Sequence, residues 1–411
     1  MANTYIGGSD GAGLLDPEQW VGTMQETFWG ESQATQLYNL ELSNVLARGT
    51  VAHKPYSTTS KAATYTPGTA GTVIDVTATD DTIVANTTKV IWEYIDRIEG
   101  SQSMYNIYEE RAREMGRHMN NLLEQAAAAN ITSANSSLDD GSIGGTAGNN
   151  IVMSPTNIDK IFSAAARQLD GLRIPTVGRY AKITPRTLEN LRLFLAQKGS
   201  SEGQNVGEFG RVMNRFGFDL YVSNNCYFTA TLTMVQIAVD TDTIVLDGVT
   251  FTADADGAAV GAGHFSIQGD ADLCRAQLTN AINDSGTPGV DTFIQISATN
   301  RRRLIMDGVV ATNDNSADTM TIVAYGDIVT SETLSTSTDT WSAQIVNLEF
   351  GLKGKSINLV TTLAPKVESA NALPALLIGD YVAGHVTYGT GVWNNDKDTL
   401  VRAKIDASVF A

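Results

Sequence analysis

The chain has 411 residues, 42% of them hydrophobic, and 45 acidic against 28 basic side chains give a formal net charge of −17. At roughly 150 residues per domain, this length predicts two or three domains with buried cores, and the hydrophobic content is that of a globular protein. The deficit of Lys and Arg argues against a dedicated DNA-binding protein, because those side chains neutralise phosphates.

Targeting signals and cysteine chemistry are not evident in the sequence. No apolar run is long enough to span a bilayer, and the densest one, Leu373–Ile378, contains a proline. Residues 1–15 lack the basic and apolar regions of a signal peptide, so we expect a chain of cytoplasmic origin with no membrane partner. Cys226 and Cys274 form no CxxC pair, which predicts two reduced thiols and no zinc site.

The first 90 residues predict an arm followed by a hairpin. Residues 1–16 are Gly-rich, and Pro17 opens a helical pattern. Residues 50–89 contain 12 threonines and no Leu, Phe or Trp, which favours strands, and Pro67–Gly71 is a turn signal. We therefore expect a long two-stranded hairpin, which needs a surface to pack on. The sequence favours neither of two surfaces, a neighbouring subunit or the chain's own domain.

The clearest element follows a strand predicted at Lys89–Glu99. Residues 101–129 contain no proline, and their apolar residues recur on one helical face. The members of that face are Met104, Tyr108, Ala112, Met115, Met119, Leu122 and Ala126. A helix of this length spans roughly 40 Å at 1.5 Å per residue, so we expect a spine on which the rest of the subunit packs.

Two capped helices follow a predicted loop at residues 130–150. The first is predicted to start at Ser154-Pro155 and end at Gly171, and the second starts in the same way at Thr184-Pro185. Strands are expected around residues 180–183 and 218–222.

From residue 227 to residue 340 the composition shifts to Asp, Thr and Gly. Strands are expected at residues 243–249, 293–298 and 320–325, and Asp270 is expected to cap a helix. We interpret this stretch as an inserted α+β domain with its own small core. Strands return at residues 341–363 and 380–405.

Residues with potential for catalysis or metal binding are scattered. His53, His118, His264 and His385 have no metal-ligand spacing, and a calcium loop starting at Asp254 lacks the required acidic twelfth position. The run Arg301-Arg302-Arg303 is unusual in an acidic chain. It is predicted to bind a carboxylate patch on a neighbour or to be a solvated hairpin or strand end. No enzyme activity and no cofactor are predicted.

The order of elements and three segments resemble the Hong-Kong-97-type major capsid fold of tailed bacteriophages. Residues 180–195 (YAKITPRTLENLRLFL) resemble the strand, Pro turn and helix of the axial domain, and residues 211–225 (RVMNRFGFDLYVSNN) resemble the strand after it. Residues 380–405 resemble the closing segment, including Tyr388-Gly389-Thr390-Gly391-Val392. An insertion at this position resembles coat proteins of short-tailed phages.

The resemblance implies a domain plan. It comprises an N-terminal arm (1–49), an extended loop (50–88), a peripheral domain with the spine helix (89–150 and 341–370), an axial domain (151–226 and 371–411) and an insertion domain (227–340).

The resemblance also implies a function. The chain would self-assemble through hexamers and pentamers into an icosahedral shell around double-stranded DNA, first in the host cytoplasm and then as the virion capsid. Its other partners would be a separate scaffolding protein, a portal protein and a decoration protein. The residues expected at contacts between subunits are Lys54, Tyr56, Lys61, Tyr65, Arg301, Arg302 and Arg303. Lys54 and Lys61 would also be available to a Lys–Asn cross-link, whose Asn and Glu the sequence does not identify.

Two alternatives remain open at this point. An encapsulin-like nanocompartment would have the same fold with a cargo enzyme inside, although the large insertion disfavours it. A Thr/Asp-rich β surface or adhesion protein would need export, which the expected absence of a signal peptide disfavours.

Overall fold

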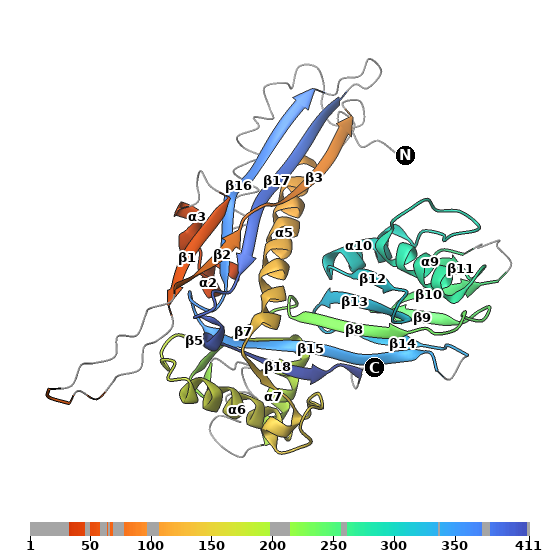
Figure 1. Ribbon diagram of the computed structural model, residues 1–411. Helices are drawn as coiled ribbons and strands as arrows, with labels where there is room; N and C mark the ends of the chain where they lie inside the picture. Colours follow the sequence, from red (N-terminus) through yellow and green to blue (C-terminus); the bar gives the residue numbers. More distant parts are fainter. Residues whose placement is uncertain are drawn as a thin grey trace. The chain divides into compact units, whose positions relative to one another are not determined.

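The computed structural model describes residues 33–45, 50–57, 64, 66–68, 78–96, 107–197, 214–255, 261–335, 338–371 and 379–408. Contacts divide the chain into two compact units. Unit 1 comprises Met1–Ser133 and Lys353–Lys397, and unit 2 comprises Ala134–Leu352 and Asp398–Ala411. Both units combine helices with sheets (Figure 1), so the α+β class predicted from the sequence is confirmed.

Unit 1 is built around one long helix and a three-stranded sheet in the order β16-β17-β3. Its elements are α2 (Ala34–Leu37), α3 (Glu41–Val45), β1 (Val51–Ser57), β2 (Ala78–Val84), β3 (Thr87–Asp96), α5 (Ile107–Ala128), η1 (Ala129–Ser133), β16 (Asn358–Asn371) and β17 (Gly379–Gly391). The Thr390 hydroxyl of β17 donates to the Ala126 carbonyl at 3.2 Å, which ties the sheet to α5. The helix predicted from Pro17 lies outside the described residues.

The long helix predicted from the sequence is confirmed over Ile107–Ala128, but its buried face differs in part from the predicted one. Met115 and Met119 are buried as expected, whereas Leu123 and Ala127 are buried in place of Leu122 and Ala126. These four buried residues lie four positions apart. Because an α-helix has 3.6 residues per turn, the buried side of the helix rotates slowly around its axis. Glu124 is also buried, so more than one side of the helix is covered in these turns.

The two-stranded hairpin predicted for residues 50–89 is confirmed in its pairing. Strands β1 and β2 are antiparallel, with Val51 opposite Val84 and Ser57 opposite Ala78.

Unit 2 contains two sheets within the described residues. The larger has nine strands: seven follow the order β12-β13-β8-β15-β5-β7-β6, β18 pairs with β15, and β4 pairs with β18. The smaller has four strands in the order β11-β10-β9-β14. The first half of unit 2 contains β4 (Ser136–Leu138), η2 (Asp140–Ile143), α6 (Ile158–Gly171), β5 (Arg179–Ile183), α7 (Pro185–Gln197), β6 (Asn214–Arg215), β7 (Phe218–Val222) and β8 (Tyr227–Thr233). The second half contains β9 (Thr243–Leu246), β10 (Val249–Asp254), β11 (His264–Ser266), α9 (Ala271–Asn283), α10 (Ala298–Met306), β12 (Val310–Asp314), β13 (Thr319–Tyr325), β14 (Thr330–Glu332), β15 (Thr340–Leu352) and β18 (Leu400–Asp406). A short 3₁₀ turn, η3 (Lys397–Thr399), leads into β18.

The first core of unit 2 lies where α6 and α7 pack on the nine-stranded sheet (Figure 1). Three aromatic rings form its centre. The Phe350 ring of β15 meets Phe162 of α6 at a centroid distance of 5.4 Å and Phe218 of β7 at 5.3 Å, both in edge-to-face geometry. All three side chains are fully buried, so they contribute both apolar area and ring contacts to stability.

One of the two predicted helix starts is correct. Helix α7 begins at Pro185, and the Thr184 hydroxyl accepts the Thr187 N–H at 3.2 Å as a capping residue should. Helix α6 was predicted to begin at Ser154-Pro155 and instead begins at Ile158. The Asn157 side chain accepts the Ser154 N–H at 2.9 Å and thereby closes a separate turn before the helix.

A second hydrophobic cluster lies in the part of unit 2 predicted as an insertion. Its buried residues come from β8, β9, β10, β11, α9, α10, β12 and β13 and from the loops between them. Asp270 caps α9 as predicted, by accepting the Leu273 N–H at 2.9 Å. A strand predicted at 293–298 is wrong, because this stretch makes only an isolated bridge at Phe293 before α10 begins at Ala298. The domain boundaries inferred from the resemblance stay a prediction.

We expect Phe350→Ala to destabilise unit 2 by about 3–5 kcal/mol, the usual cost of truncating a fully buried aromatic side chain. The half-buried Trp341, one of five tryptophans, packs against the same cluster, so tryptophan fluorescence during urea unfolding provides the measurement. Leu193→Ala on α7 removes an exposed side chain and should change the free energy of unfolding by less than about 0.5 kcal/mol. Equal unfolding midpoints for both variants would contradict the assigned core.

Candidate functional site

The seven residues predicted to contact other subunits fall into two groups. Lys54 and Tyr56 lie on β1 of unit 1, and the Arg301–Arg303 run lies on α10 of unit 2. Only the backbone of Tyr56 is described, and it pairs with Thr79. Lys61 and Tyr65 lie outside the described residues. The structure therefore places the arm residues on a hairpin and the arginines on a helix, and their contacts with other subunits stay a prediction.

At the base of the hairpin, Lys54 is held by its own unit. Its ammonium lies 3.1 Å from an Asp396 carboxylate oxygen and 5.5 Å from the centroid of the Trp393 ring. An ion pair combined with a cation–π contact orients the β1 backbone on this surface. On the same hairpin, the ring of His53 lies 2.6 Å from the carboxylate of Asp80.

The hairpin base also has an apolar seat. Ala52, Ile83 and Ala85 form a buried cluster with Val360 and Trp393. The described base of the hairpin therefore packs on its own unit, one of the two placements left open by the sequence.

Two glycines of β17 make this seat possible. A Cβ atom at Gly389 would lie 2.2 Å from the Val84 carbonyl oxygen, and one at Gly391 would lie 3.0 Å from the Ile83 side chain. The hairpin thus approaches β17 so closely that only glycine fits at position 389. Both glycines belong to the segment quoted for the resemblance, but their role was not predicted. Paired glycines inside a strand are the signal that indicates such a close approach.

The arginine run lies on α10, so its predicted placement at a hairpin or strand end is wrong. The Ser297 hydroxyl caps this helix by accepting the Asn300 N–H at 3.3 Å. Arg301 donates to the Ala281 carbonyl at 2.9 Å, and its guanidinium lies 3.6 Å from the Asp284 carboxylate. Arg301 therefore holds α10 against the end of α9, and partial burial lowers its pKa.

Arg303 joins a pair of carboxyl groups at the other end of α10. Its Nε donates to the carboxylate of Asp247, in the turn between β9 and β10. Asp307 follows the helix and lies beside Asp247. Burial, together with the neighbouring Asp247 carboxylate, raises the pKa of Asp307 to about 7. Asp307 therefore keeps its proton to a much higher pH than an exposed aspartate does.

The other groups with chemical potential are dispersed. Among the described residues, no three His, Cys, Asp or Glu side chains are grouped closely enough to hold a metal ion. Burial lowers the pKa of His118, and His264 lies 3.1 Å from the Asp254 carboxylate. Cys226 and Cys274 are both buried, and neither forms a disulfide.

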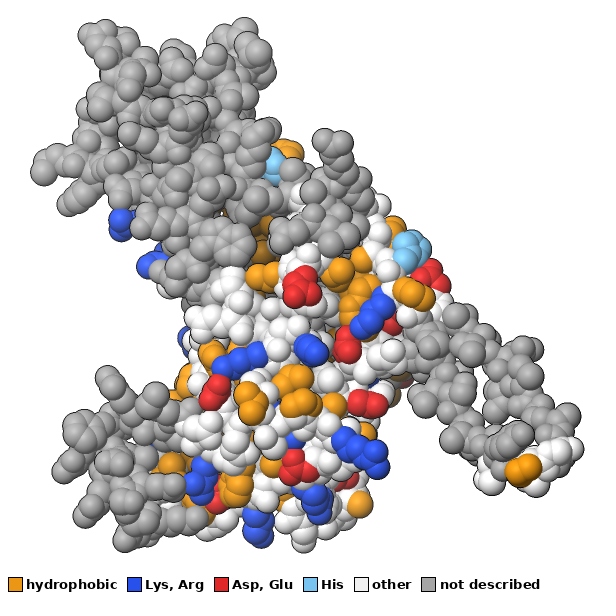
Figure 2. Space-filling view, turned by 90° about the vertical axis from the view of Figure 1, so that its left-hand side faces the viewer, with side chains coloured by type: hydrophobic (Ala, Val, Ile, Leu, Met, Phe, Trp, Pro, Cys, Tyr) orange, Lys and Arg blue, Asp and Glu red, His pale blue; other side chains and the backbone are white. Residues whose placement is uncertain are grey.

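No helix within the described ranges is both long and apolar enough to cross a bilayer. On the face in Figure 2, the coloured Lys and Arg side chains are interspersed with Asp and Glu. This mixture suits protein contacts better than the tracking of a phosphate backbone.

Comparisons with known proteins agree with this architecture. No protein-family model and no curated protein matches the chain. Among solved structures, a chain of Mycobacterium phage Che8 matches with a TM-score of 0.50 at 12% identity, over 90% of both chains. A chain from the capsid of cyanophage P-SCSP1u matches at a TM-score of 0.48 and 14% identity, over 87% of this chain and 84% of that one. A chain from the mature capsid of bacteriophage PhiM1 matches at a TM-score of 0.45 and 12% identity, over 87% of this chain and 82% of that one.

At these identities the likeness shows the fold. The chain has the fold of phage major capsid proteins, as the resemblance to the Hong-Kong-97 type predicted.

We expect Asp307→Asn to stabilise the chain increasingly as pH rises. The folded state holds a proton on Asp307 up to about pH 7, whereas the unfolded state releases it near 3.8. Wild type therefore loses stability across this window as pH rises, and the uncharged asparagine does not. Urea unfolding at about pH 5 and about pH 8 measures the change. Asp291→Asn, at an exposed position of the same unit, is the control, and equal pH dependence of both variants would refute the raised pKa of Asp307.

Proposed function

We propose that this chain is the major capsid protein of a tailed bacteriophage, a non-enzymatic subunit that assembles into an icosahedral shell around double-stranded DNA. The observation that carries the proposal is the likeness of fold, which extends over 90% of both chains in the Che8 match. A likeness to an isolated domain would leave the rest of the chain free for another function. Here the match covers 90% of this chain, so it includes most of both units.

The proposal includes the partners that such a shell needs. Copies of the chain form hexamers and pentamers, with a separate scaffolding protein, a portal protein and a decoration protein as further partners. DNA is enclosed without sequence-specific binding, which the net charge of −17 supports because an acidic wall does not grip a polyanion. The chain would assemble in the host cytoplasm and end in the virion.

The hairpin has a specific role in this proposal. Its base is seated on unit 1 by Lys54, Ile83 and the two glycines of β17. We propose that residues 58–77, which join β1 to β2 in the chain, contact a neighbouring subunit. Tyr56, Lys61 and Tyr65 belong to that proposed contact.

Negative-stain electron microscopy of the purified chain, with and without its neighbouring gene products, tests the proposal. We expect closed icosahedral shells or tubes of hexamers. The contents and size of the shells separate a phage capsid from an encapsulin-like compartment, which would enclose a cargo enzyme. A chain that remains monomeric with every candidate scaffolding protein would refute the function and favour the surface-protein alternative.

A second test replaces residues 58–77 with Asn-Gly. Ser57 and Ala78 face each other in register, so a two-residue turn joins them without moving β1 or β2. We expect a folded monomer, with unchanged circular dichroism and thermal unfolding, that forms no shells. An Asn-Gly replacement of the exposed Asn315-Ser316 turn between β12 and β13 serves as the control for turn substitution. Normal shells from the shortened hairpin would exclude the proposed role.

A further inference from the structure

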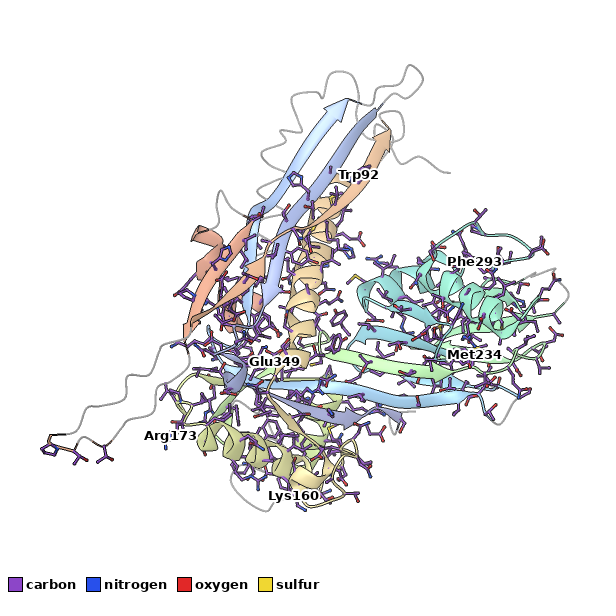
Figure 3. All side chains as sticks on the ribbon, viewed as in Figure 1. Trp92, Lys160, Arg173, Met234, Phe293 and Glu349 are labelled. Carbon is purple, nitrogen blue, oxygen red and sulfur yellow. The ribbon has the colours of Figure 1, made fainter. Side chains whose placement is uncertain are left out.

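A short segment of unit 2 exposes three aliphatic side chains. Val235, Ile237 and Val239 follow β8 and are 49%, 38% and 47% exposed, whereas Ala238 between them is buried. We call residues 235–240 the ridge. Figure 3 labels Met234, the buried residue immediately before it. Aliphatic side chains gathered in this way on a soluble protein often mark a contact with another molecule.

Buried carboxylates hold the backbone of the ridge. Asp339 accepts the N–H of Val235 at 2.9 Å, and Asp242 accepts the N–H of Val239 at 2.8 Å. The buried guanidinium of Arg275 donates to the Met234 carbonyl just before the ridge. With its backbone fixed from beneath, the ridge loses little conformational entropy when a partner binds.

The same unit contains an apolar groove. It has a volume of about 440 Å³ and lies between the end of α9, α10 and the start of β12. Its lining consists of Ile282, Asn283, Asp284, Arg301, Leu304, Ile305, Val309 and Val310. Ile282 and Leu304 are buried, whereas Ile305 and Val310 are 48% and 53% exposed. The anchoring of Arg301 to the carbonyl of Ala281 keeps the two helices in place around it.

The ridge and the groove of one chain cannot meet. Val310, which lines the groove, pairs with Val323 on β13, and Val323 pairs with Thr229 on β8. The groove therefore lies beside the part of β8 that contains Thr229. The ridge begins only after Thr233, at the other end of β8, which is roughly 15 Å further along a strand that rises about 3.3 Å per residue. Within unit 2, each surface therefore lacks the other as a partner.

Charge favours a second copy as the occupant. The ridge ends in the exposed Asp240, and α10 carries the exposed Arg302 and Arg303 beside the groove, of which Arg303 also pairs with Asp247. In a chain with a net charge of −17, copies repel each other at long range, and opposite charges where they meet favour a contact between them. Arg302 beside an apolar groove and Asp240 at the end of an apolar ridge are such opposite charges.

We propose that the ridge of one subunit inserts into the groove of a neighbouring copy in a head-to-tail contact. The contact is heterologous, because the two surfaces differ, and a series of such contacts closes into a ring when the rotation between copies permits it. Resting on the proposed function, this inference assigns the Arg301–Arg303 region to contacts within hexamers and pentamers.

Cysteine cross-linking of assembled shells tests the contact. Ile237→Cys in the ridge and Ile305→Cys in the groove are introduced together, and a short bis-maleimide replaces oxidation so that strict disulfide geometry is not required. We expect a ladder of cross-linked species up to the hexamer on a denaturing gel. Shells that contain a mixture of the two single variants should give dimers and nothing larger. The native thiols contribute little background, because both are buried and burial raises the pKa of Cys274 to about 11.

Leu193→Cys provides the matched control. Leu193 is an exposed aliphatic residue on α7, outside both surfaces, so its combination with Ile237→Cys should give no ladder. Shells that form without a ladder in the ridge–groove double variant would overturn the inference alone. Dimers from shells of Ile305→Cys alone would overturn it as well, because they would indicate a symmetric contact. A wild-type chain that never assembles would overturn the proposed function together with the inference.

Discussion

One strand connects the two hydrophobic cores of unit 2, and the rest of the unit depends on it. β15 pairs with β8 over its first part and with β5 and β18 over its second, with a register shift between Ser342 and Ile345. Val346, Leu348 and Phe350 belong to the first core, while Trp341 packs against both clusters. Because adjacent strands share backbone hydrogen bonds across this junction, the predicted insertion is continuous with the sheet of the rest of the unit.

The elements that the sequence predicts well are those with strong local signals. The long helix has a sustained apolar face, and α7 and α9 have Thr184 and Asp270 as caps, so periodicity and capping were sufficient. Helix α10 lacked such a signal. Leu304 is its one buried apolar residue, and its charged residues resemble a solvated turn. Ser297 is a good capping residue, but no apolar helical pattern follows it in the sequence.

The contact surfaces were harder to predict for a different reason. The alternation of Val235, Ile237 and Val239 is typical of the buried face of a strand, yet all three are exposed. Asp339 and Asp242 hold the backbone at this place through contacts that the local pattern does not predict. The seat of the hairpin depends on Gly389, whose neighbour Val84 is about 300 residues away in the chain. Interactions at such separation follow from the fold and not from local pattern.

Buried charges show the same dependence on tertiary structure. Lys182 and Glu349 lie opposite each other on β5 and β15, and both are buried (Figure 3 labels Glu349). The Tyr180 hydroxyl also donates to Glu349. Isolated buried charges are costly, whereas opposite charges with hydrogen bonds tolerate burial and restrict the strand register. The segment around Tyr180 thus places polar side chains in the core, which its local pattern did not predict.

The strength of the proposed ridge–groove contact bears on how a shell could assemble. Three aliphatic side chains that are each about half exposed would contribute about 3 kcal/mol when fully buried, at 1.5–3 kcal/mol per complete side chain. Association of two proteins costs about 4–15 kcal/mol in lost freedom, so one such contact does not hold a dimer. A ring supplies two contacts to each subunit, and a seated hairpin adds a further one. Weak contacts that become stable only together let misplaced subunits dissociate, and that reversibility is what a closed shell requires of its subunits.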